Sequence, residues 1–561
     1  MDAGFSHNGK TLLSAVDPAG RADRVADAVA IAGRTLYFCP SPLFGYGLER
    51  LLARLAEVPN AALLCVEADP ALFALSQGHF SPALKNDSRL RLTDQCDPAA
   101  LCALLRREWG PRFFRRVEII HLNGGWQLFP ALYDSLAQSL RQEIALDWGN
   151  AMTLAKLGRL YIRNALRNLA LIPRCPSLAG LSFGSDPALV LGAGPSLDSL
   201  LDVLPAHFGE AQRLPQTRPF RIICVDTCLP ALRERGITPD LAVILESQHW
   251  NLNDFIGLSG WQVPAAFDLS ALPRSGAVLS GGVFLFFTPW ARLAIFQRLD
   301  SSGLLPVAVP PLGSVGLSAV SIVRSLTRGP IVTAGLDFAF TPDSYHARST
   351  PGHLGRLRRQ NRFAGLLNAQ AAFDGAVSVT SRTGGKVFSN PALRSYRDLF
   401  QREFATGNGA ASIFDLATGG LPLGVPSLSL EKAIDVLKGM GNGEWGMGES
   451  RNVSIDKSNI AALTEKLRAF IQNEQGRLTL LRDTLTGRAP MNHTALDALI
   501  DECDYLWAHF PDYAAAERRP GKAELEAGSP QAVSFLKRLR VEIDPFLKLL
   551  DLTLRELCSV L

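Results

Sequence analysis

Hydrophobic and polar positions in the middle of the chain alternate in the manner of buried strands, polar turns and helices. An apolar run at 188–191 leads into the turn 192–196 (GAGPS), and the periodic segment 197–204 predicts a helix. Apolar runs at 221–225 and 241–245 predict the next strands, each followed by polar residues. Strands that alternate with helices predict a doubly wound parallel α/β domain, in which ligands bind beyond the carboxyl ends of the strands.

The turn at 192–196 combines residues that suit an anion. Gly192 and Gly194 let the backbone approach a ligand closely, because glycine has no Cβ. Pro195 suits the first position of a helix, and Ser196 can cap the helix or bind a phosphate oxygen. The first N–H groups of a helix have no acceptor within it, so we expect this turn to bind a phosphate.

Further polar or small residues fall where the same edge of the sheet is expected. Each of them alone is also compatible with a solvated loop, but together they favour a ligand site. They are Asp226 and Thr227, then Glu246, Ser247 and Gln248, then Gly313, Ser314 and Gly316 at the start of a helix, and Asp337 after a strand at 331–334. The polar loop 341–353 adds Tyr345, His346 and His353.

The order of these segments resembles that of the motility-associated-factor (Maf) glycosyltransferases. The resemblance rests on GAGPSL at 192–197, GITPD at 236–240, GSVGLSA at 313–319 and GLDFA at 335–339. The domain is also similar to the one described as hydroxymethylpterin pyrophosphokinase MptE-like, and the core is similar to bacterial CMP-sialic acid sialyltransferases. The resemblance implies inverting, metal-independent transfer of a nonulosonic (sialic acid-like) sugar from CMP to Ser or Thr of a protein, with flagellin as the expected acceptor.

Transfer from a CMP donor to a hydroxyl would give individual residues the following roles. The turn 192–196 and the helix start at 313–316 would hold the donor, a CMP-sugar substrate that requires no cofactor or metal. His346 is the expected general base, His353 is the second choice, and Tyr345 would bond the leaving phosphate. A lone histidine in a loop is more often solvated than catalytic, so that alternative stays open. The chain has Pro310-Pro311 where the sialyltransferases carry an arginine.

Composition and length limit the class of protein. A chain of 561 residues is too long to fold around a single hydrophobic core. Its net charge of +4 does not favour nucleic acid as a partner. Nine cysteines at irregular spacing, without a C-x-x-C pair, favour a reducing compartment. The longest apolar stretch, 276–287, is short and interrupted by glycines, and the N-terminus lacks a signal-peptide pattern. We therefore expect a cytoplasmic protein without a membrane span.

The chain is expected to form four segments. Residues 1–150 predict a Rossmann-like N-terminal domain, and 151–184 predict a linker helix. Residues 185–425 form the expected central catalytic α/β domain, and 426–561 a helical C-terminal domain. In the first segment Glu67 follows a strand about twenty residues after a glycine-containing turn. This spacing is compatible with ribose binding, but a purely structural role is favoured because the glycine motif is incomplete.

Two other functions remain open. A 6-hydroxymethylpterin pyrophosphokinase that uses ATP and Mg²⁺ would need carboxylates near the triphosphate. Only Glu246 stands where those kinases are expected to carry a D-x-D pair, although Asp226 could join it across the strand ends. The second alternative is a non-enzymatic scaffold that binds flagellin or another partner.

Overall fold

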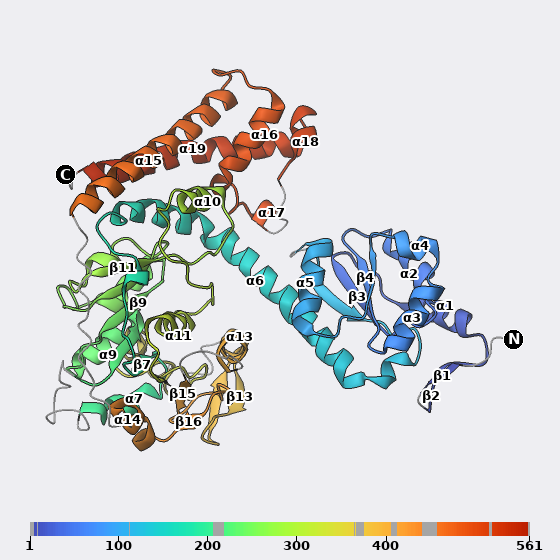
Figure 1. Cartoon of the computed structure of the whole chain (residues 1–561), viewed down its shortest axis with the longest axis horizontal. Coiled ribbons are helices and arrows are strands. Elements are labelled where there is room, and N and C mark those ends of the chain that lie inside the picture. Colours follow the sequence, from blue (N-terminus) through green and yellow to red (C-terminus); the bar gives the residue numbers. More distant parts are fainter. Residues whose placement is uncertain are drawn as a thin grey trace. The chain divides into compact units, whose positions relative to one another are not determined.

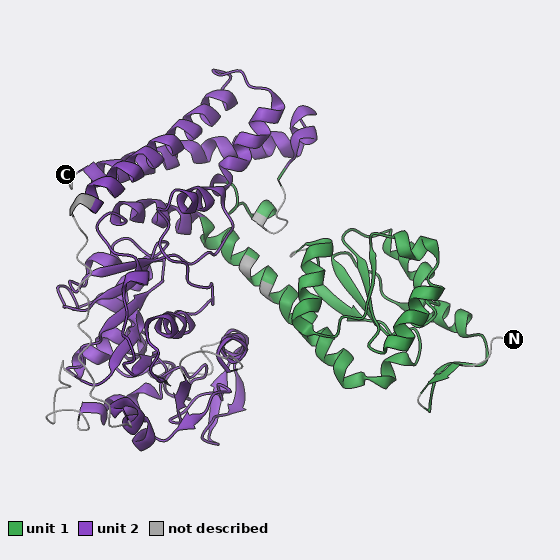
Figure 2. Ribbon diagram, in the orientation of Figure 1, with its two compact units in different colours: residues 1–158, 507–519 green, residues 159–506, 520–561 purple. Residues whose placement is uncertain are grey.

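The computed structural model describes residues 5–7, 9–110, 113–205, 218–363, 365, 375–405, 412–439, 457–514 and 519–558. The chain divides into two compact units: residues 1–158 with 507–519, and residues 159–506 with 520–561 (Figure 2). Helix α6 (Pro130–Asn168) contains the boundary between the units, so the helix predicted from residue 151 is part of a longer one. The finer division into four segments stays a prediction.

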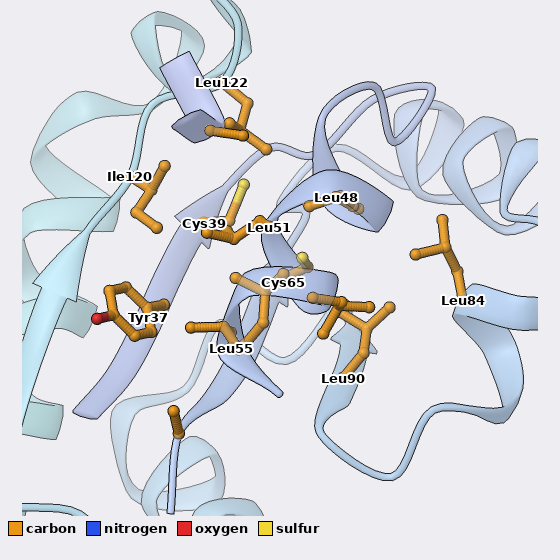
Figure 3. Packing of buried hydrophobic residues seen from close by; sticks show 14 of the residues in the cluster. Tyr37, Cys39, Leu48, Leu51, Leu55, Cys65, Leu84, Leu90, Ile120 and Leu122 are labelled. Atoms are coloured by element: carbon orange, nitrogen blue, oxygen red, sulfur yellow. The ribbon is translucent and has the colours of Figure 1, made fainter. Parts of the chain in front are cut away.

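The first unit contains a parallel four-stranded sheet in the order β5-β4-β3-β6 (Figure 1). Apolar residues on both faces of β3 and β4 are fully buried, which is typical of a parallel sheet covered by helices. Figure 3 shows Leu48, Leu51 and Leu55 of α2 packed against Tyr37, Cys39 and Cys65 of the sheet. The elements are β1 (Phe5–His7), β2 (Lys10–Leu13), α1 (Pro18–Ala28), β3 (Thr35–Pro40), α2 (Leu48–Leu55), β4 (Ala62–Val66), α3 (Pro70–His79), α4 (Pro82–Asn86), β5 (Leu90–Thr93), α5 (Pro98–Trp109) and β6 (Arg116–Ile119).

Glu67, at the end of β4, is fully buried and bonded within the unit. It accepts hydrogen bonds from Ser41 Oγ at 2.6 Å, from the Asp69 N–H at 3.2 Å and from Tyr133 Oη at 3.4 Å. Burial raises the pKa of this carboxyl above its ordinary value. Both oxygens of Glu67 are used inside the protein, an arrangement that favours the structural role over ribose binding.

The second unit is built on eight parallel strands in the order β11-β10-β9-β8-β7-β12-β15-β16 (Figure 1). The chain starts at β7 in the middle, proceeds outwards to β11, and returns to the opposite side of β7 with β12. The predicted doubly wound parallel sheet is thereby confirmed. The point between β7 and β12 is the switch point where such folds bind ligands. The strands are β7 (Ala188–Leu191), β8 (Arg221–Val225), β9 (Leu241–Ile244), β10 (Ala265–Asp268), β11 (Val283–Phe286), β12 (Ile331–Ala334), β15 (Ile413–Leu416) and β16 (Ser427–Leu428).

Helices and a short ribbon surround this sheet. Helix α11 is rich in small and β-branched residues, its residues from Gly316 to Val320 are all buried, and the helix packs against the sheet. Gly329 and Pro330 separate it from β12. The helices are α7 (Leu197–Leu201), α9 (Leu229–Glu234), α10 (Ala294–Ser301), α11 (Val315–Leu326), α12 (Pro351–Arg359), α13 (Pro391–Phe400) and α14 (Leu430–Lys438), and the antiparallel ribbon is β13 (Val377–Thr380) with β14 (Lys386–Ser389).

The C-terminal region is helical, as predicted. Helices α15 and α19 pack against each other, and Arg298 of α10 forms an ion pair with the buried Glu474 of α15 at 2.8 Å. No helix among the described residues is both long and apolar enough to cross a membrane. The helices are α15 (Lys457–Leu485), α16 (His493–Glu502), α17 (Pro511–Ala514), α18 (Lys522–Glu526) and α19 (Pro530–Cys558).

Candidate functional site

Two glycine-containing turns meet at the switch point between β7 and β12. The N–H of Gly194 donates to the carbonyl oxygen of Gly335 at 2.8 Å. A Cβ at Gly192 would lie 2.6 Å from that same oxygen, and a Cβ at Gly335, where φ is +70°, would meet the carbonyl of Gly192. The glycines therefore let two backbone segments approach each other. In this arrangement their close approach is to protein, whereas the sequence suggested a ligand.

Asp337 closes the N-terminus of α7. The N–H of Ser196 donates to Asp337 Oδ2 at 2.8 Å, and Ser196 Oγ donates to Asp337 Oδ1. Both residues are buried. The chain's own carboxylate thus lies where an external phosphate was expected, because the first N–H groups of a helix favour negative charge. The predicted phosphate contact of Pro195 and Ser196 stays a prediction.

Arg382 belongs to this cluster, and sequence reasoning missed it. Its guanidinium is 4% exposed, forms an ion pair with Asp415, and lies 3.8 Å from Asp337 Oδ1. It also donates to the carbonyl of Leu336 at 3.1 Å. Burial lowers the pKa of Arg382 to about 10, while Asp337 opposes this shift. Arg382 lies in the turn between β13 and β14, where no strand-end pattern could indicate its contact with residues after β12.

The polar loop 341–353 lies against the turn after β7. The N–H of Ala347 donates to the carbonyl of Ala193 at 2.9 Å, and the N–H of Arg348 donates to Asp198 Oδ2 at 3.0 Å. These bonds place Tyr345 and His346 beside the switch point, with their ring centroids 4.8 Å apart. The predicted base and the GAGPS turn are thus brought together.

The environment sets the protonation of this loop. Burial lowers the pKa of His346 to about 4, so its imidazole is neutral at pH 7 and is a weaker base than an exposed imidazole. Burial also raises the pKa of Tyr345, with Tyr396 of α13 adding to the shift. His353 lies in the first turn of α12, where its N–H donates to Thr350 Oγ1 at 3.4 Å. Of the three predicted residues, Tyr345 and His346 are those that directly precede Ala347, the residue bonded to the turn after β7.

The N-terminus of α11 differs from that of α7. Ser314 is its N-cap residue, but the Ser314 hydroxyl makes no bond to the helix backbone. A Cβ at Gly316 would lie 2.6 Å from Leu336 Cδ2, the same methyl that lies against Gly192. The first turn of α11 therefore lies close to the turn after β7. Because the first N–H groups of a helix have no internal acceptor, this helix start can receive an anion.

A pair of carboxyl groups lies at the ends of β8 and β9. Asn251 Nδ2 donates to Asp226 Oδ2 at 2.7 Å and to Asp254 Oδ2 at 3.3 Å. Thr227 Oγ1 donates to Asp254 Oδ2 at 3.2 Å. Burial, and after it the charge of Asp254, raises the pKa of Asp226 to about 7. Burial raises the pKa of Asp254 to about 6, so the pair retains a proton that separate aspartates would lose.

Asparagines at the end of α6 hold the loops after β9 and β10. Asn164 Nδ2 donates to the carbonyl of Ser247 at 2.9 Å and to that of Ser270 at 3.1 Å. Asn168 Nδ2 donates to the carbonyls of Leu269 and Ala271. Glu246 accepts the N–H of Gln248 at 2.9 Å. Helix α6 therefore holds the predicted group 246–248 at the carboxyl edge of the sheet. The sequence did not suggest this contact.

Several buried polar atoms near the ends of the strands have no hydrogen-bond partner within the part of the chain that the structure describes. Buried polar groups in proteins are nearly always bonded, so each unpaired atom marks a place where a ligand or water could supply the partner. Only Ser247 among them was predicted from the sequence. They are Ser247 Oγ and Asn251 Oδ1 after β9, Thr288 Oγ1 and Trp290 Nε1 after β11, Ser318 Oγ in α11, and Thr418 Oγ1 after β15.

Comparisons with known proteins first show which class of domain this segment is similar to. Residues 163–343 match the family model of 6-hydroxymethylpterin diphosphokinase MptE-like proteins. That range extends from the end of α6 to the loop after β12, and it contains most of the residues described above.

A solved structure then shows which protein shares the arrangement. The Maf glycosyltransferase from Magnetospirillum magneticum AMB-1 aligns with all of this chain and 86% of that chain, with a TM-score of 0.51 and 15% sequence identity. The resemblance to the Maf glycosyltransferases is thereby confirmed for the fold.

Two relatives come from Treponema pallidum (strain Nichols), and both are described as uncharacterized proteins. One is 29% identical over 545 residues, which cover 94% of this chain and 90% of the relative. The other is 25% identical over 132 residues, which cover 23% of this chain and 58% of the relative. The first likeness extends through both compact units.

Proposed function

We propose that the chain is a glycosyltransferase that moves a nonulosonic sugar from a CMP donor to a Ser or Thr hydroxyl of a protein, with flagellin as the proposed acceptor. The observation that carries this proposal is the position of the loop bearing Tyr345 and His346. This loop is bonded to Ala193 after β7, close to the open N-terminus of α11. The fold shared with a Maf glycosyltransferase supports the same proposal.

In the proposed reaction the donor phosphate binds the first N–H groups of α11. As the bond between the anomeric carbon and the phosphate oxygen breaks, negative charge grows on CMP, and the dipole of α11 stabilises it. The acceptor oxygen forms a bond to the anomeric carbon from the opposite face, which inverts the configuration. His346 accepts the proton that this oxygen loses, and Tyr345 donates a hydrogen bond to the departing phosphate. No cofactor or metal enters this scheme.

The proposal predicts CMP binding that depends on α11, and calorimetric titration of the full chain tests it. Val315 is the first residue of α11, and proline is well tolerated at that position, where it removes one N–H without ending the helix. Val315→Pro should therefore weaken CMP binding about tenfold, the effect of losing one hydrogen bond to a charged group. Leu430→Pro makes the same change at the first residue of α14 and is the control.

The result should not change when EDTA is added. Full affinity of the Val315→Pro variant for CMP, or no CMP binding by the unaltered chain, would refute the proposed donor site. Ser196→Ala is a less informative variant, because it also removes a bond to Asp337.

A 6-hydroxymethylpterin pyrophosphokinase is the second candidate function, and the match of residues 163–343 supports it. Such an enzyme needs Mg²⁺ held by carboxylate oxygens. Here Asn251 donates an N–H to one oxygen of Asp226 and to one oxygen of Asp254, so both carboxylates already have a partner within the protein, which disfavours a magnesium ion at that place. Titration with ATP and Mg²⁺ tests this alternative. Binding of ATP only in the presence of Mg²⁺, without binding of CMP, would favour the kinase.

A further inference from the structure

Two aromatic rings lie together near the ends of β9, β10 and β11. The ring of Tyr161 in α6 is 5.1 Å from that of Trp290, which follows β11. Tyr161 and Asn164 are three residues apart and share one face of α6, the face that holds the loops after β9 and β10. Burial, followed by the charges of Glu246 and Asp268, raises the pKa of Tyr161 to about 12. Glu246 directly precedes Ser247, whose carbonyl is held by Asn164, so its carboxylate belongs to the loop that this face of α6 holds.

Three polar atoms in this neighbourhood are buried and unpaired among the described residues: Trp290 Nε1, Thr288 Oγ1 and Ser247 Oγ. Their positions are nevertheless fixed. The backbone N–H of Thr288 donates to Asp268 Oδ2 at 2.7 Å, and the carbonyl of Ser247 accepts from Asn164 at 2.9 Å. Rigidly held groups without partners are what a preformed binding site requires.

We propose that Tyr161, Trp290, Thr288, Ser247 and Glu246 form a subsite for an uncharged part of a sugar that carries hydroxyl and amide groups. The indole N–H is a donor, the two hydroxyls are donors and acceptors, and the carboxylate is an acceptor. This mixture matches hydroxyl groups, and the faces of the two rings suit the C–H surface of a sugar. The assignment to a transferred sugar rests on the proposed function.

We call this group of five residues the aromatic subsite. Its charge distinguishes it from the proposed phosphate site. Glu246 and Asp268 make the surroundings of Tyr161 and Trp290 acidic, so a phosphate or a carboxylate is repelled there. The ring of Tyr396 lies beside the start of α11, 3.3 Å from where a Cβ of Gly313 would stand. In the proposed arrangement the anionic end of a donor faces α11 and its polyol end faces Trp290.

Calorimetry on the full chain with CMP and with CMP-N-acetylneuraminate tests the aromatic subsite. Trp290→Phe keeps the ring and removes the N–H, and Thr288→Val keeps the shape and removes the hydroxyl. Each should weaken binding of the CMP-sugar about threefold to tenfold, the effect of one lost neutral hydrogen bond, and leave CMP binding unchanged. Trp250→Phe is the matched control, because the Trp250 side chain after β9 is 67% exposed.

Saturation-transfer NMR with the uncharged methyl glycoside of N-acetylglucosamine distinguishes failure of the subsite from failure of the proposed function. If neither CMP compound binds but the glycoside signal is present and is lost in Trp290→Phe, the proposed donor is wrong and the subsite stands. If both variants bind the CMP-sugar and the glycoside as the unaltered chain does, the subsite is refuted while CMP binding still supports the function. A chain that binds none of the three probes refutes both.

Discussion

Replacing Asp337 with alanine removes the acceptor of two buried bonds from Ser196. The same change takes away one of the two carboxylates near Arg382, which is left with Asp415. Hydrogen bonds to a charged group contribute about 1.5–3 kcal/mol each, and breaking a buried ion pair costs about 3–5 kcal/mol. The two contributions overlap, so we expect Asp337→Ala to lower the local free energy of unfolding by about 4 kcal/mol.

Asp337→Asn is the graded partner of this variant. Its amide oxygen can still accept the N–H of Ser196 at the position of Oδ2, now 2.8 Å away, but the negative charge beside Arg382 is lost. We expect about half of the effect, roughly 2 kcal/mol, because one neutral bond replaces a charged pair of bonds. The local free energies of unfolding of the unaltered chain, Asp337→Asn and Asp337→Ala, taken in that order, then show how much of the stability comes from charge.

Hydrogen exchange read by mass spectrometry is the suitable assay, because a chain with two compact units need not unfold in one step. A loss of about 4 kcal/mol accelerates exchange about a thousandfold in peptides that cover 188–201. Peptides that cover 35–66 in the first unit are the internal control. Exchange within threefold of the unaltered chain at 188–201 would refute the view that Asp337 closes the N-terminus of α7.

Three other predictions concern the loop with His346 and the carboxyl pair. A Cβ at Gly352 would lie 2.5 Å from His346 Nδ1, so Gly352→Ala should displace the imidazole and lower kcat by tenfold or more. Gly355→Ala in the same helix is the control and should leave kcat unchanged, because a Cβ there would lie 3.4 Å from the Arg359 guanidinium. Equal rates for the two variants would contradict the assigned base. Because burial lowers the pKa of His346 to about 4, kcat/KM should stay constant from pH 8 to pH 6 and fall only near pH 4; a loss near pH 6.5 would show that the imidazole titrates as if exposed. Asp226 and Asp254 have raised pKa values and bind a proton more tightly in the folded chain than in the unfolded one, so they lower stability as the pH rises from about 4 to about 7. Asp226→Asn should flatten this slope and raise the local free energy of unfolding at pH 8 by about 1 kcal/mol, measured by hydrogen exchange at pH 5 and pH 8 in peptides that cover 221–225. An unchanged slope would count against the shared proton.

The sequence predicts the central sheet well because its signals are local. Four-residue apolar runs such as 188–191 and 331–334, each bounded by glycine turns, are strands, and the helix starts at Leu197 and Val315 are where small residues and serine indicated them. The polar loop with His346 could also be placed near the GAGPS turn, since both follow strands that end at one edge.

The contacts that complete the site could not be predicted, because they join distant segments. Arg382 comes from a ribbon, Tyr161 from the end of a long helix, and Trp290 from an irregular loop. Nothing in the residues next to them indicates that they lie near this edge. Asn251 and Asp254 left a faint signal, a polar pair three residues apart in the segment after β9, a spacing that suits one turn of helix. The role of the glycines in the turn 192–196 could not be predicted for the same reason, because the segment that approaches this turn is distant in the sequence. Ser196 and Asp337, which meet there, are 141 residues apart.

The switch point between β7 and β12 has a consequence for synthesis of the protein. Strands β7 to β11 leave the ribosome well before β12, and until then one edge of β7 has no neighbouring strand. At ordinary translation rates the 141 residues between Ser196 and Asp337 take on the order of ten seconds to make. During that interval the turn after β7 has neither its carboxylate nor the loop that bears His346. A nascent chain therefore completes the edge of the sheet at β7 and β12 only when the second half of the sheet is made, and a chaperone that shields the edge of β7 would act in that interval.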